Sequence, residues 1–138
     1  MKYNINETLN FLLVLGLAFY TFIRGFFFFK EQESVLSDSD FYLALHQIMP
    51  IWCWGIIIMI FSIILAISVY FLPKQKTSNK YSWFLFIGGF GCAFLYFLMT
   101  SASIYNSINW LSTIQFSILS ALCFSIGFVG GADIYDRR

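Results

Sequence analysis

Charged side chains are scarce in this chain. Aspartate, glutamate, lysine and arginine make up 11% of its 138 residues, whereas 59% of the residues are hydrophobic and the mean hydropathy is +0.76. A water-soluble protein of this size needs more polar surface to cover its core. The composition therefore excludes a soluble globular domain and predicts a membrane protein.

Cysteine is also rare, and its placement excludes two classes of stabilised fold. Cys53, Cys92 and Cys123 each lie inside an apolar run, with no paired spacing. Neither a disulfide framework nor a zinc site is expected from such positions. A buried free cysteine usually behaves as a small hydrophobic residue, so we interpret all of them as packing residues.

The chain has a single histidine, His46. Met49 and Cys53 follow it at i+3 and i+7, so a continuous helix would place three soft ligands suited to copper on one face. Pro50 interrupts that segment, however, and no second histidine or cysteine is close in sequence. We therefore expect an interfacial histidine beside packing residues, with no metal and no cofactor.

Motifs for catalysis or nucleic-acid binding are missing as well. The sequence has no nucleophile motif, no phosphate-binding glycine loop and no paired catalytic carboxylates. It also has no basic patch interleaved with stacking aromatic residues. We expect a protein that is not an enzyme and does not bind nucleic acid.

Long apolar runs are what the chain does have. Each is about 20 residues long, which at about 1.5 Å per residue spans a hydrocarbon core of about 30 Å. They predict an all-α, polytopic membrane protein with a single domain, 1–138. The four expected spans cover about 9–29, 51–72, 81–100 and 108–130, joined by an outer loop at 30–50 and a cytoplasmic loop at 73–80.

Basic residues predict how these spans are oriented. Lysine and arginine in short loops favour the cytoplasmic side of a membrane. With both termini inside, only Arg24 and Lys30 fall outside. We therefore predict that both termini are cytoplasmic (N-in, C-in), with these residues on the inner side: Lys2, Lys74, Lys76, Lys80, Arg137 and Arg138.

The outer loop is acidic and carries a helix signal. Ser37 followed by Asp40 resembles a capping box, and apolar residues follow at helical spacing. This pattern predicts a short amphipathic helix from 38 to about 49, lying on the outer membrane surface with its apolar face down.

Aromatic residues follow at the start of the second span. Pro50 suits the first turn of a helix, where a proline loses no internal hydrogen bond. Trp52 and Trp54 come directly after it, and tryptophan is enriched at headgroup depth. Both are expected at the outer interface.

Small residues recur at helical spacing in the third and fourth spans. Pairs of small residues four positions apart allow two helix backbones to approach closely in lipid. We predict that these two helices pack on each other. The expected packing residues are Gly88 with Cys92, Gly89 with Ala93, and the stripe Ser117, Ala121 and Ser125.

Arg24 lies near the end of the first span, where an unpaired charge is costly. Two interpretations are open. Its side chain either extends to the headgroups beside Lys30, or it faces the interior or a carboxylate such as Glu31 or Asp38.

The layout of four spans, together with residues 45–55 and an enrichment in Asn, Lys, Ile and Phe, resembles small four-span membrane proteins often carried by prophages of Gram-positive bacteria. Small multidrug transporters differ, because their first span contains a glutamate. Quinone-linked disulfide enzymes differ, because they carry Cys-x-x-Cys. The prophage resemblance implies a host-protective or regulatory role. It also implies a multi-pass protein of the bacterial cytoplasmic membrane.

Two kinds of function fit these observations. The first is a non-enzymatic protein that acts in the lipid bilayer through helix–helix contacts with itself or with another membrane protein. The second is a holin-like pore, in which Arg24 and a set of serines line a polar path in an oligomer. Those serines are Ser112, Ser117, Ser120 and Ser125.

Overall fold

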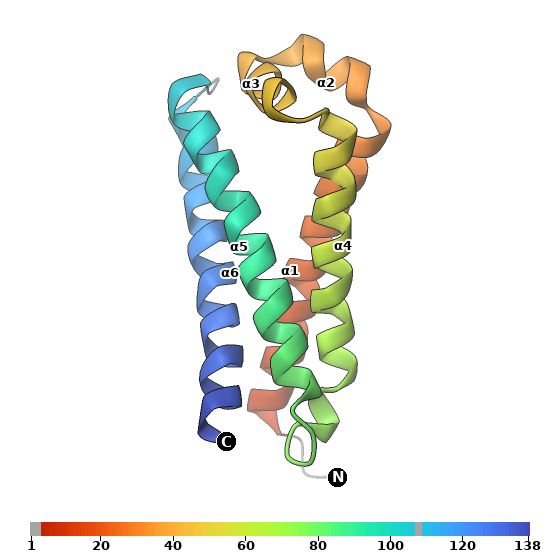
Figure 1. The fold of residues 1–138 in the computed structure, drawn as a ribbon, viewed down its shortest axis with the longest axis vertical. Coiled ribbons are helices and arrows are strands. Elements are labelled where there is room, and N and C mark those ends of the chain that lie inside the picture. The colour runs from red at the N-terminus through yellow and green to blue at the C-terminus, as the bar shows by residue number, and fades with distance from the viewer. Residues whose placement is uncertain (1–3, 107–108) are drawn as a thin grey trace.

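The computed structural model describes residues 4–106 and 109–138, and within them four helices are long and apolar enough to cross a membrane. This confirms the predicted all-α class. Lys2 and the expected start of the fourth span at Ile108 lie outside the described residues. The long helices are α1 (Ile5–Lys30), α4 (Ile51–Tyr70), α5 (Lys80–Asn106) and α6 (Trp110–Asp136) (Figure 1).

These helices form an elongated bundle. The most extensive contacts join α5 to α6, followed by α1 to α4 and α4 to α5, whereas α1 and α6 have hardly any close backbone contact. The N-terminal end of α1 and the C-terminal end of α6 lie at the same end as the turn after the 3₁₀ helix Leu72–Lys74 (Figure 1). We call this the lysine end, and the opposite end the α3 end.

Two pairs of glycines let helix backbones touch. A Cβ atom on Gly89 of α5 would lie 2.6 Å from the backbone nitrogen of Gly127 in α6. A Cβ atom on Gly55 of α4 would lie 2.6 Å from the carbonyl oxygen of Gly25 in α1. In lipid, helices associate through such close packing because no hydrophobic force drives them together. These two contacts therefore set the spacing of the bundle.

One buried hydrogen bond links α1 to α5. The hydroxyl groups of Thr21 and Tyr96 are 3.0 Å apart, and both side chains are almost completely buried. Each hydroxyl thereby has a partner away from water, where an unpaired polar group is costly. Cross-helix hydrogen bonds of this kind contribute about 0.6 kcal/mol on average.

The connection between α1 and α4 contains two short helices, α2 (Gln32–Asp38) and α3 (Asp40–Ile48) (Figure 1). Ser39 separates them and is the N-cap of α3, since its hydroxyl accepts a hydrogen bond from the Phe41 N–H at 3.1 Å. The prediction of Ser37 as the cap was therefore wrong. Ser37 lies inside α2, because the chain turns two residues later than the capping-box pattern indicated.

The apolar face of α3 lies against the bundle. Phe41 and Leu45 are buried, and the Phe41 ring stacks on Phe116 of α6 with centroids 5.5 Å apart. Ile48 at the end of α3 is 75% exposed. The sequence pattern predicts that the whole apolar face rests on the membrane surface. Phe41 and Leu45 instead cover the bundle, whereas Leu43 and Ile48 remain exposed and can contact the membrane surface.

Trp54 connects α3 to α4. Its indole N–H donates to the carbonyl oxygens of Leu45 and Met49, both at 3.1 Å, and the side chain is only 4% exposed. Trp52 is 42% exposed, as an interfacial residue would be. The Trp54 ring is therefore covered by protein and the Trp52 ring is not, while the interfacial depth expected for both rings stays a prediction. Pro50 is the N-cap residue of α4, one position before the first turn.

Replacing Trp54 with phenylalanine should loosen α3. The variant keeps most of the buried ring but removes the indole donor. The Leu45 carbonyl still accepts from the Met49 N–H, whereas the Met49 carbonyl loses its donor, which costs about 1–3 kcal/mol for a buried group. Amide hydrogen exchange in residues 40–49 should become faster, whereas Trp52→Phe should leave it unchanged. Equal exchange in the two variants would show that Trp54 does not hold α3.

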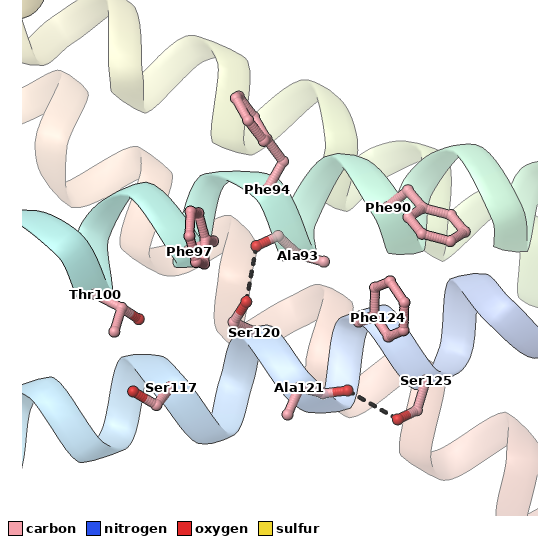
Figure 2. Close-up of a pocket in the computed structure, with 10 residues that line it drawn as sticks. All are labelled: Phe90, Ala93, Phe94, Phe97, Thr100, Ser117, Ser120, Ala121, Phe124 and Ser125. Carbon is pink, nitrogen blue, oxygen red and sulfur yellow. Dashed lines mark hydrogen bonds between the residues drawn. The ribbon is translucent and has the colours of Figure 1, made fainter.

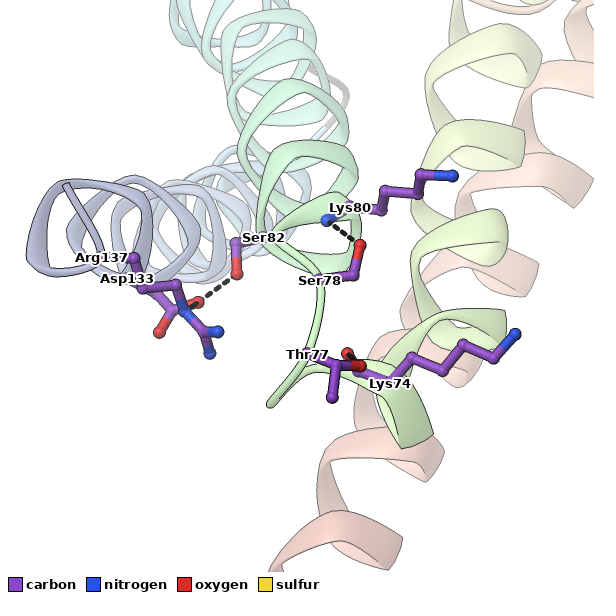
Figure 3. Close-up of polar contacts among 7 residues, drawn as sticks. All are labelled: Lys74, Thr77, Ser78, Lys80, Ser82, Asp133 and Arg137. Carbon is purple, nitrogen blue, oxygen red and sulfur yellow. Dashed lines mark hydrogen bonds and ion pairs between the residues drawn. The ribbon is translucent and has the colours of Figure 1, made fainter.

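The lysine end combines several polar contacts with exposed cations (Figure 3). The hydroxyl of Ser82 in α5 donates to the carboxylate of Asp133 in α6, which also pairs with Arg137 at 2.9 Å. Lys74, Lys76 and Lys80 are exposed, and the first and last of these point away from Asp133 (Figure 3). The lysines thus remain free to face water or lipid headgroups.

Candidate functional site

An open groove of about 600 Å³ runs along the seam between α5 and α6 (Figure 2). Phenylalanine side chains from both helices border it, among them Phe94 and Phe97, which are 62% and 59% exposed. Its floor consists of small residues, including Ala93 and Ala121. A concave, apolar surface of this kind can accept the ridge of another helix.

The serines of the groove are already hydrogen-bonded. Ser117 and Ser125 donate to carbonyl oxygens of their own helix at 2.9 and 2.8 Å, and Ser120 donates across the seam to the Ala93 carbonyl at 3.0 Å (Figure 2). Ser112 donates to the Asn109 side chain at 3.2 Å. Serine in a membrane helix commonly bonds back to its own backbone in this way. The groove floor is therefore small and weakly polar.

The predicted packing residues of α5 lie on two different faces. Gly89 packs against Gly127 of α6, whereas Gly88 packs against Leu65 of α4. Cys92 and Ala93 are also buried, and the Cys92 thiol contacts Cys123 of α6. The run of small residues thus serves two interfaces, because α5 is packed between α4 and α6.

The predicted packing face of α6 was wrong. Ser117, Ala121 and Ser125 are exposed along the groove. The side of α6 that is buried against α5 instead contains Cys123, Gly127 and Gly130. A spacing of four residues identifies a stripe on a helix but does not say which stripe faces the partner. The stripe that faces the partner is the one that allows the closest backbone approach.

His46, Met49 and Cys53 do not share one helix face. The chain leaves the helical conformation at Met49, where φ is −158° and ψ is 144°, so α3 ends before Cys53 in α4. His46 Nδ1 accepts a hydrogen bond from the Ile51 N–H at 3.4 Å. The continuous helix on which a copper site would depend is therefore not formed.

Arg24 faces α6. Its Nη2 donates to the Tyr20 hydroxyl at 2.7 Å, and its Cζ lies 4.9 Å from the centre of the Phe116 ring. The side chain thus extends back along α1, away from Lys30. Across residues 4–106 and 109–138 the structure shows one ion pair, that of Arg137 with Asp133, and the side chain of Asp38 is outside the described part. Interior placement is the interpretation that this geometry supports.

A polar cavity of about 230 Å³ surrounds Arg24. Side chains from α1, α3, α5 and α6 line it, including Ser39, Ser103 and Gln115. Gln115 also lines a neighbouring cavity of about 270 Å³ with Leu17 and Ile118. Sequence reasoning identified Arg24 but missed Gln115, although an amide within an apolar span is itself a signal of an interior or functional position.

No protein-family model matches the chain, and comparisons with curated proteins and with solved structures find no match either. Two features of the molecule are therefore the candidates for function. The first is the α5–α6 groove, and the second is the pair of cavities between α1 and α6. Both are built from membrane-spanning helices, and both open beside residues that sequence analysis had singled out.

Proposed function

We propose that this membrane protein acts without catalysis, by holding a transmembrane helix of a partner membrane protein in the α5–α6 groove. The observation that carries the proposal is the groove itself, with its phenylalanine borders and its floor of small residues. Between helices in lipid, association depends on van der Waals packing at such small-residue surfaces.

The hydrogen bonds of the groove support an apolar occupant. Ser117, Ser120 and Ser125 already donate to carbonyl oxygens, so a helix that covers them leaves no hydroxyl unpaired. The same bonds leave each of these serines only its oxygen lone pairs, so a pore lined by them would offer few groups to replace the hydration of an ion. Partner binding therefore has more support than the holin-like alternative.

The concave shape supports a different protein as the occupant over a second copy. In a two-fold symmetric dimer the same patch of each copy meets at the interface. Two identical grooves facing each other would enclose an empty space instead of filling it. A convex ridge from another helix fills the groove, so the proposal commits to a helix of a different membrane protein.

Charge and resemblance add the cellular setting to this proposal. The exposed lysines and both described chain ends lie at the lysine end, which supports a cytoplasmic location for that end. The resemblance to prophage-borne membrane proteins would make the captured partner a host membrane protein. Capture of its helix would serve a regulatory or host-protective role.

Filling the groove should abolish this binding. A photoreactive benzoylphenylalanine at position 97 should give a crosslinked adduct in cells, and mass spectrometry should identify a second membrane protein in it. Ala121→Phe places a ring on the groove floor and should reduce the adduct about tenfold or more, as overpacking costs about 1–3 kcal/mol. The control is Val129→Phe, because Val129 of α6 is 59% exposed and does not line the groove.

Three outcomes of this experiment are informative. Loss of the adduct in Ala121→Phe with retention in Val129→Phe supports the proposal. Equal adduct yields in the two variants, or a strictly monomeric protein with no adduct in cells, contradict it. An adduct that contains only this chain would make a second copy the occupant.

A further inference from the structure

The seam between α1 and α6 changes from polar to apolar along its length. The polar cavity contains Arg24 of α1 with Ser112 and Gln115 of α6, near the α3 end. The apolar cavity lies farther from that end on both helices, with Leu17 on α1 and Ile118 on α6. A phospholipid has the same order, with its headgroup outside and its acyl chains toward the middle of the bilayer.

Arg24 has unused hydrogen-bonding capacity inside this seam. A guanidinium has five N–H donors, and the structure shows one of them donating to the Tyr20 hydroxyl. The Nε atom is buried and has no partner among the described residues. A buried donor at membrane depth without an acceptor is costly, and such a group commonly marks a ligand site.

The surroundings hold the Arg24 guanidinium in place for an anion. Its Cζ atom lies 4.9 Å from the centre of the Phe116 ring and 5.4 Å from that of the Tyr20 ring, and these cation–π contacts restrict its position. The planar fork of arginine matches the oxygens of a phosphate group, to which it can donate two parallel hydrogen bonds. Ser39, Ser112 and Gln115 add neutral polar groups to the same cavity.

The geometry points to a binding site for one anionic phospholipid in the α1–α6 seam, with its phosphate on Arg24 and one acyl chain along Leu17, Ile118 and Leu119. The polar cavity of about 230 Å³ is several times the roughly 30 Å³ occupied by a water molecule, so it accommodates a phosphodiester. This site is separate from the groove that binds the partner helix, and it does not depend on that function.

The described carboxylates of the outer loop do not line the polar cavity. Glu31, Glu33 and Asp40 are exposed, and no carboxylate is among the described residues that line the polar cavity. Exposed charges are screened over about 8 Å at physiological salt. A zwitterionic lipid would bring its own cation close to Arg24, so a net negative headgroup such as that of phosphatidylglycerol is favoured.

The test is retention of lipid by the purified protein. Native mass spectrometry in detergent, after addition of phosphatidylglycerol or phosphatidylcholine, counts the bound molecules. The wild-type chain should retain more phosphatidylglycerol than phosphatidylcholine. Arg24→Gln should weaken this retention about tenfold or more, since hydrogen bonds to charged groups are among the strong ones. The control Lys30→Gln removes an exposed cation of the same helix and should behave as wild type.

A second variant keeps the test decisive if Arg24→Gln fails to fold. Ile118→Trp leaves Arg24 intact and fills the apolar cavity, so it should also lower phosphatidylglycerol retention. Unchanged retention in either folded variant, or equal retention of both lipids by the wild type, would overturn the proposal. Stabilisation by inorganic phosphate that depends on Arg24 but not on Ile118 would overturn the lipid assignment and indicate a site for a free oxyanion.

Discussion

Replacing Gly89 with leucine is expected to separate α5 from α6. Even a Cβ atom at this position would lie 2.6 Å from the backbone nitrogen of Gly127 and 3.0 Å from the carbonyl oxygen of Cys123. Backbone cannot rotate out of the way as a side chain can, so the helices must move apart. Overpacking of this kind costs about 3 kcal/mol or more in unfolding free energy at so tight a contact.

The cysteines of the chain provide the measurement for Gly89→Leu. Cys92 and Cys123 are both 0% exposed at the α5–α6 interface, so a thiol-reactive dye reports its opening once Cys53 is replaced by serine. The variant should react at a lower temperature than the parent. Gly16→Leu is the matched control, because a Cβ atom there meets nothing within 4 Å. If both variants react like the parent, the two backbones are not in contact.

Gly55→Leu should have a comparable effect on the other tight interface. A Cβ atom at Gly55 would lie 2.6 Å from the Gly25 carbonyl oxygen and 2.8 Å from the Phe29 nitrogen, so α1 must move away from α4. The expected cost is again about 3 kcal/mol. Displacement of α1 should also break the hydrogen bond between Thr21 and Tyr96 and accelerate amide hydrogen exchange in α1.

The two leucine variants should differ in which interface opens. Gly55→Leu should leave Cys92 and Cys123 protected from the dye until the whole bundle unfolds, because the contacts of α5 with α6 do not involve α1. Gly89→Leu should expose these thiols while α1 remains protected from exchange. Identical dye and exchange profiles in both variants would indicate that the bundle opens as one unit, contrary to the separate glycine contacts.

The sequence predicts only part of the site around Arg24. Arg24 was identified because any charge at membrane depth requires a partner or a path to water. Its direction was left open, because an arginine is long enough to reach either the headgroups or a neighbouring helix. Phe116 and Gln115, which surround it, lie more than 90 positions away in sequence, and nothing local indicates that they meet Arg24.

The groove shows a related limit. Ser117, Ala121 and Ser125 form a small-residue stripe that sequence analysis assigned to packing within the bundle, but the structure leaves it exposed. Glycines at 127 and 130 allow a closer approach than serine or alanine, so α6 turns these glycines toward α5. The remaining stripe is available to another helix, which moves its expected role from internal packing to binding.

By itself the sequence determined the class of this protein and its number of spanning helices. Both follow from the lengths of the apolar runs alone, because a bilayer requires about 20 apolar residues for every crossing. The hydrocarbon core also provides no hydrogen-bond partner for the backbone, so each crossing must be a helix. Only the tertiary structure decided which helix faces meet, where Arg24 points and how α3 attaches to the bundle through Trp54. These features depend on how each helix is rotated about its own axis. Close contact between helix backbones determines that rotation, and amino-acid composition does not.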